Sequence, residues 1–210
     1  MIENIKKLAI HGKAKTGKST VAKLIHQNFQ DDVFETAFAN PIKNLLRDLF
    51  GCNYEDLFGS SEKRQKLFLN NLTYRDMLQD FGELAKKYNP NIWIEKTEQN
   101  IISNLSRITF KQPKDIVINQ NTLYLNTMFI PNDYKLILIT DLRFKTEYDW
   151  LKSKNFKLLK LKRSNNDYSS NHISETELDS MADNSFDFHM DNDGTIDDLA
   201  RKVRDLISSL

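Results

Sequence analysis

The sequence predicts an α/β domain built on a doubly wound, mostly parallel five-stranded sheet that helices cover on both faces. Three observations support this fold class. Short apolar segments alternate along the chain with segments of helical periodicity. Leu136-Ile137-Leu138-Ile139 is a continuous apolar run, which is typical of a central parallel strand. A loop rich in glycine and lysine, residues 12–19, separates the first predicted strand from the first predicted helix.

The N-terminal half is predicted to begin with a strand at 8–10 and a helix at 20–29. Pro41 suits the first turn of a later helix and Gly51 its C-terminal cap. Thr73 is an N-cap candidate, with Asp76 three residues further on. The remaining predicted elements of this half are a strand at 33–38 and helices at 41–51, 54–69, 74–88 and 92–105.

The C-terminal half is predicted to hold the other three strands, at 136–139, 156–161 and 186–190. Residues 108–130 alternate loosely and are interpreted as a small hairpin or irregular insert. A helix is expected at 144–154, and Thr195 caps the last helix, whose buried face repeats at helical spacing. The alternation of strands and helices places ligands at the carboxyl ends of the strands.

Composition narrows the function classes. The chain of 210 residues holds 30 Lys plus Arg and 29 Asp plus Glu, for a formal charge of +1. This balance argues against a nucleic-acid or membrane partner. The single cysteine, Cys52, excludes an internal disulfide, and no Cys/His cluster resembles a zinc site. No secretory signal and no window of about 20 apolar residues is present, so a cytoplasmic location is expected (the host cytoplasm if the protein is viral).

The strongest functional signal is Gly12-Lys13-Ala14-Lys15-Thr16-Gly17-Lys18-Ser19, which matches the phosphate-binding pattern G-x-x-x-x-G-K-[ST] in the strand–loop–helix context it requires. Its glycines let backbone N–H groups turn inward toward phosphate, and the helix that follows adds its positive end. Lys18 is expected to reach the β and γ phosphates of ATP, and the Ser19 hydroxyl to ligate Mg²⁺. The candidate ATP-binding residues are Gly12, Lys15, Thr16, Gly17, Lys18, Ser19 and Thr20.

Charged residues follow the central strand. Asp141 is placed to hold the Mg²⁺ shell, and Arg143 to clamp a phosphate with two hydrogen bonds. Glu147 lies within reach of Arg143 if the stretch is helical. The alternative for all three residues is a strand-end cap with a surface ion pair.

Other candidates have weaker support. Arg75 and Gln79 share a helix face that also carries Gly82 and Lys86; they would bind an acceptor phosphate and base, or the face is merely solvated. Trp93 is suited to stack on a base or to pack in the core.

The C-terminal third holds further candidates. Arg163, with His172 and Glu175 after it, is suited either to a lid that closes over the transferring phosphate or to a solvated loop. The turn Asn192-Asp193-Gly194-Thr195 would pass beside the adenine or simply cap the last helix, so Asn192 and Gly194 join the ATP-binding candidates.

Several segments together resemble the bacteriophage-type deoxynucleoside monophosphate kinases, in the order in which that family carries them and over nearly the whole chain. Two departures stand out: Ser19 occupies a position where many members carry Asp, and residues 107–134 have no counterpart. The matching segments are 12–20, Ala39-Asn40-Pro41-Ile42-Lys43, Arg75-Asp76-Met77-Leu78-Gln79-Asp80-Phe81-Gly82, Asn91-Ile92-Trp93-Ile94, Thr140-Asp141-Leu142-Arg143 with Glu147, His172-Ile173-Ser174-Glu175 and Asn192-Asp193-Gly194-Thr195.

The resemblance implies a P-loop, nucleoside monophosphate kinase-like fold, ATP with Mg²⁺, and conversion of a dNMP to a dNDP for DNA precursor supply. It implies that Lys43, Arg75, Gln79, Trp93 and Arg143 line the acceptor site. A single domain, 1–210, would then contain an acceptor-binding helical region at about 40–105, an insert at about 107–134 and a lid-like segment at about 163–180. The insert could alter acceptor choice or pack a homodimer.

Two rival functions remain open at this point. One is another P-loop small-molecule kinase, such as an animal-type phosphomevalonate kinase, against which the Arg75/Gln79 pair and the Asn-Asp-Gly-Thr turn argue. The other is a non-catalytic module in which ATP switches a partner surface. A DNA-linked ATPase is disfavoured because the chain lacks a basic stripe.

Overall fold

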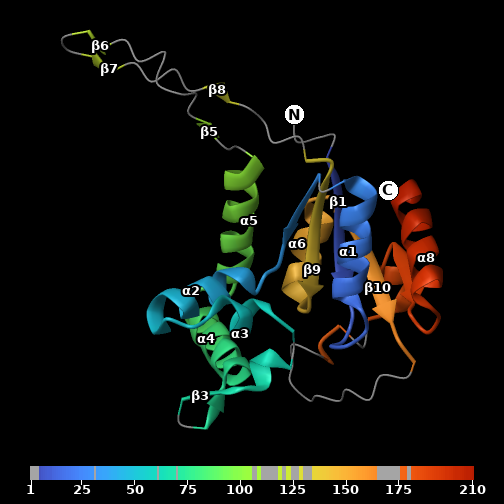
Figure 1. The fold of residues 1–210 in the computed structure, drawn as a ribbon, viewed down its shortest axis with the longest axis horizontal. Helices are drawn as coiled ribbons and strands as arrows, with labels where there is room; N and C mark the ends of the chain where they lie inside the picture. The colour runs from blue at the N-terminus through green and yellow to red at the C-terminus, as the bar shows by residue number, and fades with distance from the viewer. Residues whose placement is uncertain are drawn as a thin grey trace.

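The computed structural model describes residues 5–30, 32–60, 62–69, 71–105, 134–164, 176–178 and 181–210, together with short strands between 108 and 129. A five-stranded sheet lies at its centre (Figure 1). The strand order is β11-β10-β1-β9-β2, and every neighbouring pair is parallel. The strands are β1 (Lys6–His11), β2 (Val33–Thr36), β9 (Leu136–Leu142), β10 (Lys157–Lys162) and β11 (Phe188–Asp191).

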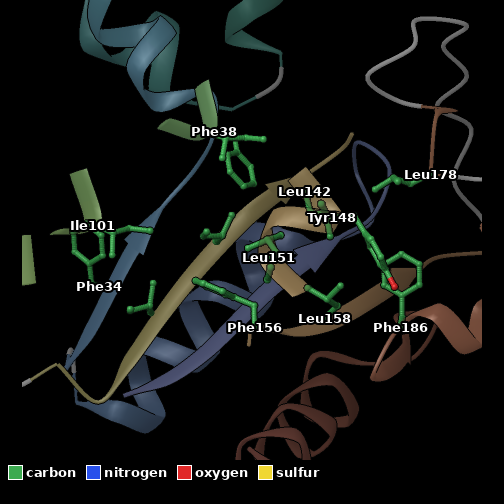
Figure 2. Packing of buried hydrophobic residues seen from close by; sticks show 14 of the residues in the cluster. Phe34, Phe38, Ile101, Leu142, Tyr148, Leu151, Phe156, Leu158, Leu178 and Phe186 are labelled. Atoms are coloured by element: carbon green, nitrogen blue, oxygen red, sulfur yellow. The ribbon is translucent and has the colours of Figure 1, made fainter. Parts of the chain in front are cut away.

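Helices cover both faces of this sheet, so the expected doubly wound α/β architecture is confirmed. On one face, α1 and α8 bury Val21, Ile25, Leu199 and Val203 against the strands. On the other face, α5 and α6 pack around a second cluster, part of which Figure 2 draws. The helices of the two layers are α1 (Lys18–Phe29), α5 (Ile92–Leu105), α6 (Lys145–Ser153) and α8 (Ile196–Ser209).

A helical lobe lies beside the carboxyl ends of the strands, at the lower left of Figure 1. It contains α2 (Asn40–Phe50), α3 (Tyr54–Phe58) and α4 (Tyr74–Tyr88). The lobe has its own apolar cluster, which includes Leu46, Leu57, Met77 and Trp93. Its α4 begins at a complete capping box, because Thr73 and Asp76 bond to each other's backbone N–H, as the sequence predicted.

The prediction of one helix over 54–69 was wrong. The structure has α3, then the 3₁₀ helix η1 (Lys63–Gln65), and then β3 (Leu67–Leu69), which pairs antiparallel with β4 (Leu72–Thr73). The α-helix ends at Gly59, and a Cβ atom there would collide with the Glu55 carbonyl oxygen. Asn71 adopts a left-handed conformation (φ 63°), which asparagine tolerates in tight turns.

The insert contributes short antiparallel pairs, in keeping with the predicted hairpin: β5 (Ile108–Thr109) pairs with β8 (Met128–Phe129), and β6 (Ile118–Asn119) with β7 (Thr122–Leu123). The rest of the insert lies outside the described residues. So does most of the lid-like segment, including His172 and Glu175, although the 3₁₀ helix η3 (Asp183–Ser185) follows it. No helix in the described part of the chain is long and apolar enough to cross a membrane.

Candidate functional site: a phosphate loop beside a cationic cavity

The glycine-lysine loop joins the central strand β1 to α1, as the sequence predicted. Gly17 has a φ of 103°, a conformation that glycine tolerates and other residues rarely adopt. A Cβ atom on Gly12 would lie 2.7 Å from the Leu161 carbonyl oxygen and 2.8 Å from Thr16 Oγ1. Both glycines of the motif are therefore required by the packing of the loop.

The lysine of the motif lies along the inside of the loop. Lys18 Nζ donates hydrogen bonds to the carbonyl oxygens of Gly12 and of Lys13, the latter at 2.7 Å. Thr16 is buried, and its hydroxyl donates to the Lys13 carbonyl at 2.8 Å. Ser19 follows in the first turn of α1 and is exposed. A phosphate chain in the loop would take over the hydrogen bonds that Lys18 gives to the loop.

The opposite side of the loop is tied to the ends of β10 and β11. Asn192 Nδ2 donates to the Thr16 carbonyl at 2.9 Å, and Asn192 N donates to Lys162 O at 2.8 Å. Asp193 accepts from both Ser164 N and Ser164 Oγ. Two predicted ATP-binding residues, Arg163 and Gly194, are thereby placed on this side of the loop, and Arg163 is exposed.

A cavity of about 730 Å³ opens between the loop and the helical lobe. Its wall begins at Lys18 and Ser19 and continues over β2, α2, α4 and the end of β9. Every predicted acceptor-site residue lines it: Lys43, Arg75, Gln79, Trp93, Arg143 and Glu147, together with Asp141. The structure thus gathers into one hollow residues that lie more than a hundred positions apart.

The helix face predicted from α4 points at this cavity. Arg75, Gln79, Gly82 and Lys86 all line it, with Lys86 Nζ 3.4 Å from the centroid of the Phe144 ring. Trp93 is only 8% exposed, and its indole N–H donates to the Gly82 carbonyl at 3.1 Å. The tryptophan therefore packs α5 onto α4, which is the core alternative raised by the sequence, and it also lines the cavity.

Asp141 fixes the backbone at the start of α2. Its Oδ1 accepts from Phe38 N at 2.7 Å, and its Oδ2 accepts from Ala39 N at 2.9 Å. If Mg²⁺ binds here, Asp141 would contribute to its shell through bound water, since Mg²⁺ usually keeps several of its waters. Among the described residues, no group of three or more His, Cys, Asp or Glu side chains is placed to hold a metal. The Ser19 hydroxyl would supply a protein ligand to Mg²⁺ bound with nucleotide phosphates.

Glu147 has a structural role that the sequence did not specify. Its Oε2 accepts hydrogen bonds from Arg143 N at 2.8 Å and Phe144 N at 3.0 Å, so the carboxyl group closes the first turn of α6. Burial raises the pKa of Glu147 to about 8, and the nearby negative charge of Asp141 acts in the same direction. The two amide hydrogen bonds act in the opposite direction.

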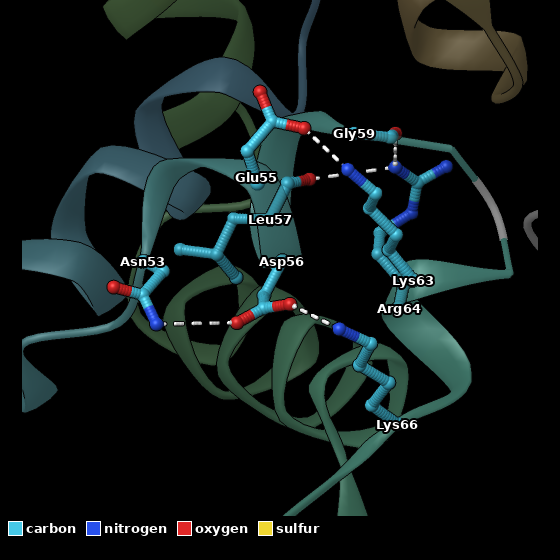
Figure 3. Close-up of polar contacts among 8 residues, drawn as sticks. All are labelled: Asn53, Glu55, Asp56, Leu57, Gly59, Lys63, Arg64 and Lys66. Carbon is cyan, nitrogen blue, oxygen red and sulfur yellow. Dashed lines mark hydrogen bonds and ion pairs between the residues drawn. The ribbon is translucent and has the colours of Figure 1, made fainter.

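Sequence reasoning missed Arg64, a further cation of the cavity wall. Arg64 Nη1 donates to the Gly59 carbonyl at 2.6 Å and to the Leu57 carbonyl at 3.4 Å, which anchors the guanidinium on the end of α3 (Figure 3). Its neighbours Lys63 and Lys66 pair instead with Glu55 and Asp56. Nothing in the local pattern separates Arg64 from these lysines, and only the turn at Gly59 directs it inward.

The cations of the cavity act on one another. Burial, together with the positive charges of Arg64 and Arg143, lowers the pKa of Lys43 to about 8, although Asp141 and Glu35 oppose the shift. Lys43 Nζ also lies 5.0 Å from the centroid of the Phe58 ring. A lysine crowded by two arginines is the arrangement expected of a site built for an anion.

A G-x-x-x-x-G-K-S loop between the central strand of a parallel sheet and a helix places the domain in the class of P-loop folds. The chain is a distant homologue of a protein of Acanthamoeba polyphaga mimivirus named "Putative deoxynucleotide monophosphate kinase". The two are 25% identical over 201 residues, which cover 93% of each chain. No protein-family model matches the sequence.

Proposed function

We propose that the chain is a kinase that transfers the γ-phosphate of ATP to a deoxynucleoside monophosphate, giving ADP and a dNDP for DNA precursor synthesis. The observation that carries the proposal is the position of the cationic cavity: it starts at Lys18 and Ser19 of the phosphate loop and is lined by Lys43, Arg64 and Arg143. A second phosphate held there would face the end of the ATP chain. The distant homology to the mimivirus protein supports the same conclusion.

In this proposal the loop amides and Lys18 would hold the β and γ phosphates of ATP, Asn192 and Gly194 would pass beside the adenine, and Arg163 would close over the transferring phosphate. Ser19, directly, and Asp141, through water, would hold Mg²⁺, which would supply positive charge to the phosphate oxygens. Arg143, which lines the cavity, would offset the charge that develops during transfer. No protein nucleophile is needed, because phosphoryl transfer depends on alignment and charge stabilisation.

The acceptor phosphate would be bound by Lys43 and Arg64, and its base would lie toward Arg75 and Gln79 on α4. A volume of about 730 Å³ accommodates a nucleotide-sized ligand. The segment at 163–180, most of which lies outside the described residues, is proposed as the lid that excludes water from the reaction. A homodimer packed through the insert at 107–134, and a cytoplasmic location, remain part of the proposal.

The test is ADP release from ATP and Mg²⁺ in the presence of dAMP, dGMP, dCMP, dTMP, their ribose forms or phosphomevalonate. Strong stimulation by one or more deoxynucleotides is expected, and the Lys18→Ala variant should lose it while keeping its fold. Stimulation by phosphomevalonate alone would assign a different kinase class. An absence of stimulation by every acceptor, with ATP still bound, would favour a regulatory ATP-binding module.

A further inference from the structure

The pairing between β1 and β9 is interrupted beside the candidate site. Ala9 pairs with Ile139, but the next pair is His11 with Leu142, so two steps along β1 match three along β9. The additional residue of β9 lies in the Thr140–Asp141 stretch. Such a bulge bends its strand and re-aims side chains, and bulges are common beside active sites.

His11 bonds across the strands at this bulge. Its Nδ1 lies 3.0 Å from the Leu142 carbonyl oxygen, and the contact is buried. A carbonyl oxygen can only accept, so Nδ1 carries the proton in this contact. The His11 side chain therefore connects the last residue of β1 to the last residue of β9 beyond the irregular step.

The two residues joined by this bond each adjoin a different part of the site. His11 immediately precedes Gly12, the first residue of the phosphate loop. Leu142 is flanked by Asp141, which fixes the start of α2 through Phe38 N and Ala39 N, and by Arg143. The hydrogen bond is thus a direct tie between the phosphate loop and the strand end that shapes the acceptor cavity.

Packing holds the imidazole ring in place. His11 is 7% exposed, and its ring stacks on Phe186 with centroids 5.5 Å apart and planes inclined by 25°. Phe186 in turn meets the edge of Tyr148, a residue of α6 that follows Glu147 (Figure 2). The imidazole ring therefore makes two interactions that can be removed separately, a hydrogen bond to Leu142 and a stacking contact with Phe186.

We propose that His11 is a positioning residue whose hydrogen bond to the Leu142 carbonyl sets the bulged end of β9, and with it Asp141 and Arg143, at a fixed distance from the phosphate loop. The inference rests on the proposed function for its catalytic consequence, but not for its structural one. Without this bond the extra residue of β9 can change its conformation, and Asp141 and Arg143 then lose their alignment with the phosphate loop.

Two substitutions separate the hydrogen bond from the stacking contact. His11→Phe keeps a ring against Phe186 and removes the donor. His11→Asn removes the ring and keeps an amide N–H close to the position of Nδ1. Val203→Ala, on α8 at the opposite face of the sheet, serves as the control for a general loss of stability.

The first measurement needs no ligand. Hydrogen–deuterium exchange of the Phe38 and Ala39 amides reports whether Asp141 is still in place. We expect His11→Phe to exchange about five-fold faster at these amides, the loss typical of one hydrogen bond. His11→Asn and Val203→Ala should match the wild type there. Because the readout uses the free protein, it stays valid even if no dNMP is phosphorylated.

The second measurement is kinetic. In His11→Phe, kcat should fall roughly 10-fold or more, because misplaced reacting groups lose alignment. Its Kd for ADP, measured by calorimetry, should change less than about two-fold. His11→Asn should restore most of kcat. Faster exchange in His11→Asn with wild-type behaviour in His11→Phe would assign the role to stacking and overturn the proposal. Equal behaviour of the two variants, whether both unchanged or both impaired, would also overturn it.

Discussion

The side-chain amide of Asn192 lies against Gly17, in the space where any other residue would carry its Cβ atom. The two residues come from opposite ends of the chain, and the same amide nitrogen donates to the Thr16 carbonyl at 2.9 Å. Asn192, the residue after β11, thereby packs against the phosphate loop from one side.

Gly17→Ala should abolish nucleotide binding. The new methyl group would displace Asn192, and alanine is strained at a φ of 103°. Calorimetry with ADP and Mg²⁺ measures the effect. The control is Gly51→Ala, because Gly51 also has a positive φ (65°) but nothing within 4 Å of its Cβ position. Strain at a positive φ should cost each variant roughly 1–2 kcal/mol of stability, so unchanged ADP affinity in Gly17→Ala would contradict this account of the loop.

Arg64→Ala should raise the KM for the acceptor about 10- to 100-fold, since a charge-assisted hydrogen bond contributes roughly 1.5–3 kcal/mol. The KM for ATP should stay within about two-fold of the wild-type value. Lys63→Ala is the matched control, because it removes an adjacent positive charge that pairs with Glu55 instead. If the two variants change the acceptor KM equally, Arg64 acts only through the electrostatic field of the lobe as a whole.

Acceptor binding should weaken as the pH rises through about 8, where Lys43 loses its proton. The pH dependence of acceptor KM should therefore show an alkaline inflexion that Lys43→Met lacks. Arg64→Ala should move the inflexion to higher pH, because Arg64 is one of the charges that lower the pKa of Lys43. An inflexion that persists in Lys43→Met would belong to another group.

Glu147→Gln should remove a pH dependence of stability. Folding raises the pKa of Glu147 from 4.5 to about 8, so the folded state binds more protons than the unfolded state between these values. The free energy of unfolding therefore falls as the pH rises across this window. Glutamine keeps an acceptor for the amides of Arg143 and Phe144. Urea denaturation at several pH values should show the wild type losing stability relative to the variant, and parallel curves would contradict the shift.

The phosphate loop and the parallel sheet were predictable because their signals are local. A fixed spacing of glycines and lysine defines the loop, and the apolar run ending at Ile139 defines β9. The shared cavity face of Arg75 and Gln79 was predictable for a related reason, since their spacing on one helix is regular. Each of these features depends on periodicity or spacing within a short segment.

The positions of Arg64 and His11 were not predictable, because each depends on an irregular feature. Arg64 reaches the cavity wall through the turn at Gly59 within a segment whose composition suggested a continuous helix. His11 gains its role from an additional residue in β9, more than a hundred positions away in the chain. The raised pKa of Glu147 likewise depends on tertiary burial, which no sequence pattern measures.

The strand order has a consequence for the order of folding. β1 and β2 come first in the chain but do not pair with each other; both pair with β9, which begins at Leu136. In the described part of the chain, the residues of the cluster that holds Leu46, Met77 and Trp93 all precede β9. During synthesis on the ribosome we expect this helical lobe to fold early, while both edges of β1 remain unpaired. The growing chain would then be most exposed to aggregation, and most dependent on chaperones, until β9 emerges.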